Sequence, residues 1–289
     1  MTYRLTESDP TMAAFLRRVA GEQLAAGVEA LEGDDPHEAV HGGRKRVKRV
    51  RALLRLVRGG FDGFDAENGY LRDAARLVSD FRDRQAAVET LDRLAALDGA
   101  PDLAGLRRVL ADARDAAARR DEVRDRIATF RSALESVRRA AADWELAEVG
   151  WEAVAPGLHK SYKKGRKALK TARKESSEEH FHDLRKRVKD HRAHARLLRP
   201  LWPGPLRARA RELSRLASLL GERHDLDTFA PHVEDGPLDA GARTALRETL
   251  TTERARLDTE ALTLGARVYA DKPGTFVKRW GKWYGVWRE

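Results

Sequence analysis

The sequence has 289 residues, of which 42% are hydrophobic and 35% charged, and it contains no cysteine. This length can bury a sizeable core in one large or two ordinary domains, and the lack of cysteine excludes disulfides, thiolate metal sites and a cysteine nucleophile. The formal net charge of +10 favours a polyanionic partner such as nucleic acid, polyphosphate or an anionic surface.

Leu, Ala, Arg and Glu dominate the chain, in long periodic runs between Gly and Pro residues. No alternating pattern typical of strands is present, so the predicted fold class is all-α. The first ten residues are polar, unlike a signal peptide, and no apolar stretch approaches the roughly 18 residues of a membrane span. We therefore expect a cytoplasmic protein.

The first half of the chain is predicted to contain four helices joined by short polar turns. Pro36 follows a Gly and two Asp residues, a pattern typical of a helix start. The predicted helices run from Thr11 to Leu31, from Pro36 to Arg58, from Ala66 to Ala96 with a candidate break at Arg82-Asp83, and from Asp102 to Ala142.

A segment with two Trp, one Pro and two Gly, Asp143 to Gly157, separates this half from a second one of similar plan. We place the boundary after residue 147, which gives halves 1–147 and 148–289. The second half is predicted to form helices over Leu158–Lys174, Glu178–Arg199, Arg207–Leu220 and Leu238–Tyr269. Antiparallel helices with short connections are typical of bundles.

The chain ends in an aromatic row with helical spacing, formed by Phe276, Trp280, Trp283 and Trp287. We expect this row to close a core, and a membrane-surface or partner-binding role is the alternative.

The predicted helix at Glu178–Arg199 carries two stripes of different chemistry. The spacing of 3 or 4 residues within each stripe keeps its members on one face of a helix. The polar stripe consists of His182, Arg185, Lys189, Arg192 and Arg196. The mostly apolar stripe consists of Leu184, Val188, His191, Ala195 and Leu198. One face is therefore available for packing, and the other is a cationic ridge.

The same pattern occurs 141 residues earlier. There the polar stripe consists of His41, Arg44, Lys48, Arg51 and Arg55, and its apolar companions are Val47, Val50, Leu54 and Val57. Because so many positions match at one offset, we interpret the pattern as an internal duplication.

The positive charge is concentrated around these stripes. Residues 159–199 contain 15 Lys or Arg and five Asp or Glu, and residues 41–58 contain eight basic residues and no acidic one. The rest of the chain then carries a net charge of −8. A solvated helix face is the plain alternative, but such faces usually mix signs, because like charges three or four residues apart destabilise a helix. We therefore interpret the stripes as an anion site.

His41 and His182 head the two stripes. A histidine on a polar face is more often a cap or a solvated residue than a ligand, but the matched placement favours a shared role. No His, Asp or Glu stands three or four residues after either histidine to complete a metal site, and Lys186 would repel a cation near His182. We expect no metal and no cofactor, and we expect a bound polyanion to favour protonation of both imidazoles.

No catalytic motif is present. Arg82-Asp83 and the run Arg223 to Asp227 follow the predicted third helix of each half. We expect their carboxylates to cap a helix or anchor an arginine rather than to act in catalysis. A Gly-rich phosphate loop, a nucleophile elbow and a dense carboxylate cluster are all missing from the sequence. A non-enzymatic role is therefore favoured.

The stripes and two further motifs resemble the CHAD family, the conserved histidine α-helical domain. The stripes read V-H-x-x-R-x-x-V-K-R-x-R at Val40–Arg51 and F-H-D-L-R-K-R-V-K-D at Phe181–Asp190. The further motifs are G-L-x-x-x-Y-x-x-G-R at Gly157–Arg166 and L-G-E-R-H-D at Leu220–Asp225. The resemblance covers nearly the whole chain and implies two four-helix bundles, related by a pseudo-twofold axis, with a basic cavity between them that binds inorganic polyphosphate.

Two departures from the family pattern matter. Many family members carry an attached triphosphatase domain, and this chain has none, so no catalytic activity carries over. Gly42-Gly43 replaces a common polar–Leu pair, and we expect these glycines to loosen the start of that helix, since Gly disfavours a helix by up to about 1 kcal/mol.

The resemblance implies a polyphosphate site lined by both stripes, with further contacts from the helix that precedes the second stripe. The residues expected to bind polyphosphate are His41, Arg44, Lys45, Lys48, Arg51, Arg55, Tyr162, Lys163, Arg166, His182, Arg185, Lys186, Lys189, Arg192 and Arg196.

We predict a non-enzymatic polyphosphate-binding protein, located in the cytoplasm and at polyphosphate granules. A general nucleic-acid-binding protein that uses the same basic helices is the alternative, and a phosphohydrolase that uses the histidines is a more distant one. The stripes contain no aromatic residue to stack on bases and no Asn or Gln to read base edges. This composition favours a plain phosphate chain over nucleic acid.

Overall fold

The computed structural model describes residues 3–118 and 121–289, without the side chains of residues 80–82, 117, 118 and 121. All regular secondary structure in these ranges is helical, which confirms the predicted fold class. None of the helices described is long and apolar enough to cross a membrane. The α-helices are α1 (Met12–Ala30), α2 (Pro36–Val57), α3 (Phe64–Arg76), α4 (Ser79–Ala95), α5 (Ala104–Ala118), α6 (Asp121–Ala140), α7 (Ala155–Lys174), α8 (Glu178–Leu197), α9 (Pro203–Asp235), α10 (Ala240–Val268) and α11 (Pro273–Arg288).

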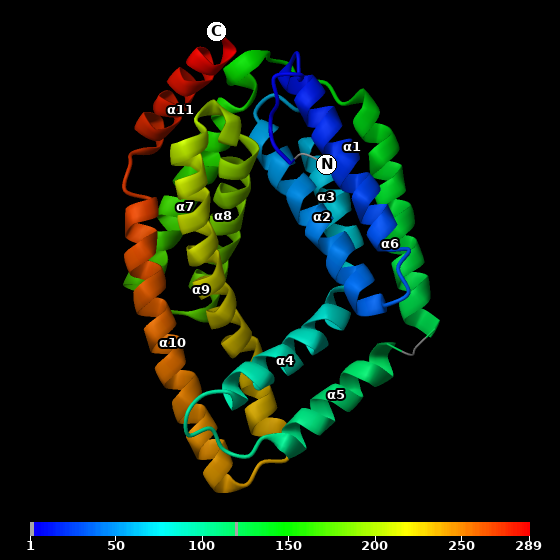
Figure 1. The fold of residues 1–289 in the computed structure, drawn as a ribbon, viewed down its shortest axis with the longest axis vertical. Helices are drawn as coiled ribbons and strands as arrows, with labels where there is room; N and C mark the ends of the chain where they lie inside the picture. Colours follow the sequence, from blue (N-terminus) through cyan, green and yellow to red (C-terminus); the bar gives the residue numbers. More distant parts are fainter. Residues whose placement is uncertain (1–2, 119–120) are drawn as a thin grey trace.

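The helices form two groups that lie side by side (Figure 1). Helices α1, α2, α3 and α6 pack together in one group, and α7 to α10 pack together in the other, with α11 against α7. Helices α4 and α5 pack on each other and leave the first group, and α4 contacts α9. Helix α2 also packs on α7 and α8. The two helices that carry the cationic stripes, α2 and α8, are therefore in contact.

The apolar stripes of α2 and α8 are buried, as predicted. Val47, Val50, Leu54 and Val57 of α2 are in the core, and so are Leu184, Val188, His191, Ala195 and Leu198 around α8. The aromatic row of α11 closes a core in the same way, because Phe276 and Trp280 are buried and Trp283 and Trp287 are half-buried against it.

Two predicted helices of the first half each correspond to two helices of the structure. The break in the first of them falls at Leu77–Val78, between α3 and α4, rather than at Arg82-Asp83. Ala74 and Val78 are buried there, and the bend after them lets α4 leave the first group while α3 stays within it. Asp83 is exposed, and the side chain of Arg82 lies outside the described residues. The predicted helix at Asp102–Ala142 corresponds to α5 and α6, and residues 119–120 between them also lie outside the described residues.

Helix α9 is much longer than predicted, with 33 residues from Pro203 to Asp235. It does not end at Leu220, because its apolar face continues through the buried residues Leu226, Phe229 and Val233. The run Arg223 to Asp227 therefore lies inside the helix. Its predicted anchoring role is confirmed, since buried Arg223 is ion-paired with Asp227 and, at 2.7 Å, with Asp258 of α10.

Gly42 and Gly43 do not loosen the start of α2, which is helical from Pro36 onward. A Cβ atom on Gly42 would lie 2.7 Å from the Cβ of Ala30, and one on Gly43 would lie 2.9 Å from side-chain atoms of Leu31 and Phe130. The two glycines therefore allow close packing of α2 on α1 and α6. Asp35 supplies the N-cap by accepting a hydrogen bond from the backbone N–H of His37.

Candidate functional site

Helices α2 and α8 are joined by two polar contacts. Arg55 of α2 forms an ion pair with Asp190 of α8, with Nη1 and Oδ1 3.0 Å apart. His194 of α8 donates from Nε2 to the backbone oxygen of Ala52, 2.9 Å away. Burial lowers the pKa of His194 to about 4, so the ring is neutral at physiological pH and acts as a hydrogen-bond donor. The predicted site residue Arg55 is thus already paired within the protein.

The centre of the two stripes is formed by Lys48 of α2 with Arg185, Lys189 and Arg192 of α8, which we call the ridge junction. Burial, together with the charges of Arg185, Lys48 and Arg192, lowers the pKa of Lys189 to about 7, and Asp225 opposes these effects. Since Lys48 acts on Lys189, the two stripes meet across the two groups of helices. Predicted residues from both halves are therefore brought together here.

Arg185 lies in a desolvated position within this junction. Burial lowers the pKa of Arg185, and Asp225 of α9 partly offsets the effect. Its Nε atom is buried and has no hydrogen-bond partner among the described residues. A guanidinium nitrogen without an acceptor is costly to bury, and an incoming anion would supply one.

Two predicted residues of α2 are held by α3. Arg51 donates from Nε to Oδ1 of Asn68 at 3.1 Å, and Arg44 donates from Nη1 to the backbone oxygen of Ala75. Burial lowers the pKa of Arg51 to about 10, with a further contribution from Arg55 and smaller ones from Arg72 and Arg76 on and at the end of α3. Helix α3 therefore adds cations that the stripe pattern does not include.

The two predicted histidines have different surroundings. His41 is exposed on α2. His182 lies against His224 of α9, with their Nδ1 atoms 3.3 Å apart and their ring centroids 4.7 Å apart. Burial and nearby cations lower the pKa of both rings, to about 4 for His224, so the pair is neutral in the unliganded protein.

The histidine pair borders a cavity of about 600 Å³ that also contains acidic side chains of the first turn of α8. No group of three or more His, Cys, Asp or Glu in the part of the chain that the structure describes is arranged to hold a metal ion. Sequence reasoning missed His224 as a site residue, although the motif L-G-E-R-H-D contains it. Its neighbour is 42 positions away, and no local spacing indicates that contact.

The remaining predicted site residues of α2 and α8 lie toward solvent. Lys45, Lys186 and Arg196 are exposed. Lys186 lies 3.6 Å from Asp183, and Arg196 donates from Nη2 to Oγ of Ser214 at 3.3 Å. These weak local contacts leave the cationic groups available to a ligand.

Two residues of the motif on α7, Tyr162 and Arg166, make contacts within the protein. Tyr162 is 1% exposed and stacks on Phe276 with ring centroids 4.1 Å apart. Arg166 donates from Nη1 to the backbone oxygens of Tyr269, Ala270 and Asp271, just after α10. Both side chains help to fix α7 against the segment after α10, and their predicted role in polyphosphate binding stays a prediction.

The glycines of this motif serve the same packing. A Cβ on Gly165 would lie 2.4 Å from the ring of Tyr269, and one on Gly157 would lie 1.9 Å from the backbone oxygen of Leu56 in α2. The remaining predicted residue of α7, Lys163, is exposed.

Comparison with known proteins agrees with this arrangement. The family model of the CHAD domain matches residues 14–234. Among solved structures, the chain is similar to the crystal structure of the CHAD domain from the plant Ricinus communis, with a TM-score of 0.65 and 16% sequence identity over 93% of this chain and 96% of that chain. This likeness shows a shared fold. No curated protein matches the sequence. Because the family model spans most of the chain and includes both stripes, the chain belongs to the CHAD domain family.

Proposed function

We propose that this protein binds inorganic polyphosphate without catalysis, through the ridge junction and the exposed parts of both stripes. The observation that carries the proposal is the placement of exposed Lys48 and half-buried Lys189 on α2 and α8, two helices that pack on each other, where the charge of Lys48 lowers the pKa of Lys189. Cations in such a position repel each other, and a polyanion relieves the repulsion. The CHAD resemblance, which implies polyphosphate binding, supports the same ligand.

The chemistry of the junction suits a chain of phosphates. Guanidinium groups such as those of Arg185 and Arg192 can hold two phosphate oxygens at once, whereas Lys189 acts as a point charge. The available anion oxygens would also provide the acceptor that Nε of Arg185 lacks. A bound polyanion favours the charged form of Lys189 and so raises its pKa again.

We also propose that the halves 1–147 and 148–289 are related by a pseudo-twofold axis. Equivalent positions differ by 141 in number, so Lys48 is equivalent to Lys189, Arg55 to Arg196, and Arg49 to Asp190. A twofold axis brings together those equivalent residues that lie next to it, and it makes the other contacts across it occur in exchanged pairs. The charge of Lys48 lowers the pKa of its equivalent, Lys189. Arg55 is paired with Asp190, and in the exchanged pair the charge of Arg196 lowers the pKa of Arg49.

The test is a binding titration of the whole chain against long-chain polyphosphate, single-stranded DNA and RNA at several salt concentrations. Affinity should fall linearly on a log–log plot against salt, because ion release drives phosphate binding. Lys189→Glu and Arg185→Glu should each weaken polyphosphate binding strongly. The matched control is Arg108→Glu on α5, an exposed arginine remote from the stripes. Equal losses for the control and the junction variants would refute the site.

Competition separates the proposal from its alternatives. Polyphosphate should displace DNA at equal phosphate concentration, and DNA should not displace polyphosphate. The reverse order would identify a nucleic-acid-binding protein. The chain length of polyphosphate after prolonged incubation should stay unchanged, and shortening that a His182→Gln variant abolishes would identify a phosphohydrolase.

A further inference from the structure

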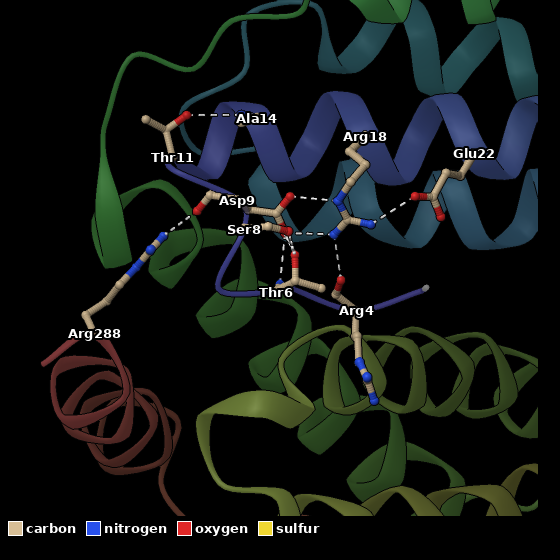
Figure 2. Close-up of polar contacts among 9 residues, drawn as sticks. All are labelled: Arg4, Thr6, Ser8, Asp9, Thr11, Ala14, Arg18, Glu22 and Arg288. Atoms are coloured by element: carbon tan, nitrogen blue, oxygen red, sulfur yellow. Dashed lines mark hydrogen bonds and ion pairs between the residues drawn. The ribbon is translucent and has the colours of Figure 1, made fainter. Parts of the chain in front are cut away.

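The N-terminal segment before α1 has a fixed conformation although it precedes the residues that the CHAD family model matches. Figure 2 shows Asp9 at its centre, where the buried carboxylate accepts hydrogen bonds from Nε and Nη2 of Arg18, both at 2.7 Å. The backbone N–H and the hydroxyl of Thr6 donate to the same carboxylate, and Arg18 also donates to the backbone oxygen of Arg4. The segment is therefore built into the fold.

The same segment is fastened to both stripe helices. The backbone N–H of Leu5 donates to the backbone oxygen of Leu197 at the end of α8, at 2.8 Å. The hydroxyl of Tyr3 donates to the backbone oxygen of Arg49 in α2, at 2.9 Å. The Arg4 side chain points away from the Asp9–Arg18 network, toward the helices of the second half (Figure 2).

Arginines from four parts of the chain gather at this place, and we call them the arginine cluster. The charge of Arg196 lowers the pKa values of Arg49, Arg192 and Arg199. The charges of Arg4 and Arg207 also lower the pKa of Arg199. Arg196 therefore connects the members of the cluster. The cluster consists of Arg4 from the N-terminal segment, Arg49 from α2, Arg192 and Arg196 from α8, and Arg199 and Arg207 from the turn after α8 and the start of α9.

The arginine cluster lacks an internal counter-charge. None of the ion pairs within the described ranges involves any of its six members. The charge of Asp190 raises the pKa of the nearby Tyr3 hydroxyl, but this carboxylate is already paired with Arg55. Burial, and then the neighbouring arginines, lower the pKa of Arg49, Arg192 and Arg199. Like charges held together in this way oppose folding unless an anion offsets them.

Part of the cluster is held in place. The guanidinium of Arg49 donates to Oε1 of Gln23 at 3.0 Å and lies over the ring of Tyr3, 5.3 Å from its centroid. Arg196 is held by Ser214 of α9. Neutral partners of this kind orient a guanidinium without cancelling its charge, which leaves the charge for a ligand. Guanidinium groups presented together match the oxygens of phosphate groups.

We infer that the N-terminal segment completes a second phosphate site, in which the arginine cluster binds phosphate groups of a linear oligophosphate or polyphosphate. The inference rests on the proposed function for its ligand class and adds a site to it. The charge of Arg192 lowers the pKa of Lys189, and the charge of Arg196 lowers the pKa of Arg192, so the two sites adjoin. A long chain would occupy both, and short oligophosphates would occupy each separately.

The test measures the binding of inorganic tripolyphosphate and of long-chain polyphosphate by calorimetry, with the full chain in each case. The cluster variant is Arg4→Glu with Arg199→Glu, and the junction variant is Lys189→Glu. The matched control is Arg108→Glu with Arg124→Glu, two exposed arginines of α5 and α6. Thermal unfolding of each variant checks the fold, and Arg4→Ala with Arg199→Ala replaces the charge reversal if that variant unfolds.

Wild type and control should bind two tripolyphosphates per chain, and the cluster variant should bind one. For the long chain, the cluster variant should lower the log–log salt slope by about 1.4, which corresponds to two lost phosphate contacts. A cluster variant that keeps two tripolyphosphates and the control's salt slope would overturn the inference. Loss of a site in the cluster variant but none in Lys189→Glu would support the cluster while refuting the proposed function at the ridge junction.

Discussion

Helices α2 and α8 carry the same pattern of basic residues, but the two sides of their contact differ in whether an acidic side chain is present. On one side of their contact, Arg55 is paired with Asp190 at 3.0 Å. On the other side, the equivalent positions hold Arg196 and Arg49, two like charges with only Gln23, Ser214 and Tyr3 as neutral partners. Under the proposed pseudo-twofold relation, the exchange of acid for base at the position of Asp190 distinguishes the contact that joins α2 and α8 from the one that we propose to bind an anion.

The two helices also differ in how tightly they pack. Where α8 has Asp183 and Leu184, α2 has Gly42 and Gly43, which let α1 and α6 approach closely. Helix α2 packs on helices of its own group and also on α7 and α8 of the other. Two helices with matching stripes can therefore have different roles, since α2 carries the cationic residues and also packs closely on its neighbours.

The largest expected effect concerns the contribution of each stripe to chain-length preference. If both stripes face one polyanion, the second contact is effectively intramolecular and raises affinity for long chains by about 10² to 10⁴. Neutralising Arg44, Lys48 and Arg51 on α2 should remove most of the length dependence and leave weak binding through α8. Affinity against chain length, measured for wild type and for each half-neutralised variant, gives the answer. Equal slopes in all three would show two independent stripes.

The ion pair on one side of the contact should matter for stability. Asp190→Ala leaves Arg55 without its counter-charge, and removal of one partner of a buried pair costs about 3–5 kcal/mol. The Arg55 side chain is 20% exposed, so we expect the lower end of that range in urea unfolding. Asp183→Ala, which breaks more exposed pairs with Lys186 and Arg187, should cost about 1 kcal/mol or less. Similar losses for both would mean that the Arg55–Asp190 contact does not fasten the halves.

The packing difference predicts a smaller effect at Gly42. Gly42→Ala brings a methyl group to 2.7 Å from the Cβ of Ala30, and overpacking of this kind costs about 1–3 kcal/mol. Gly21→Ala on α1, where a Cβ has nothing within 4 Å, should instead stabilise the protein by up to about 1 kcal/mol. Thermal unfolding of the two variants distinguishes them, and a stabilising Gly42→Ala would contradict the close-packing account.

The smallest expected effect is a pH dependence of polyphosphate affinity that arises from the titration of Lys189. The pKa of Lys189 is about 7 in the free protein, and a bound polyanion raises it, so binding takes up a proton above pH 7. Affinity should therefore fall as the pH rises from 7, by up to about tenfold per pH unit. Below pH 7 the lysine is charged in both states and adds no further dependence.

Lys189→Arg should flatten this response, because arginine stays charged throughout the range. His182 contributes at more acidic pH, because burial and Lys186 lower the pKa of its imidazole. An unchanged profile in Lys189→Arg would show that another group titrates.

Periodicity alone predicted the helices and the faces that they bury, because the 3.6-residue repeat is a local property. It placed Val188 and His191 in the core and Lys189 on the ridge. It could not predict that Asp190, one position along, meets Arg55, since that contact depends on how two distant helices cross.

Short motifs were less informative about role. Tyr162 and Arg166 were assigned to the ligand on resemblance, but their partners are a stacked Phe276 and the carbonyl groups after α10. A polar or aromatic residue in a motif can be retained for packing, and only the neighbours of its side chain show which role it has. His224 is the opposite case, because its place beside His182 follows from the unexpected length of α9.

The hydrogen bond from Leu5 to Leu197 has a consequence for the chain during synthesis. The N-terminal segment emerges from the ribosome first, but its docking position at the end of α8 exists only when about two thirds of the 289 residues have been made. Until then, the nascent chain also carries α2 with eight basic residues and no acidic one between His41 and Arg58. Domains fold during synthesis as their parts become available. When α8 emerges, Asp190 becomes available to pair with Arg55, and Leu197 becomes available to bind the N-terminal segment.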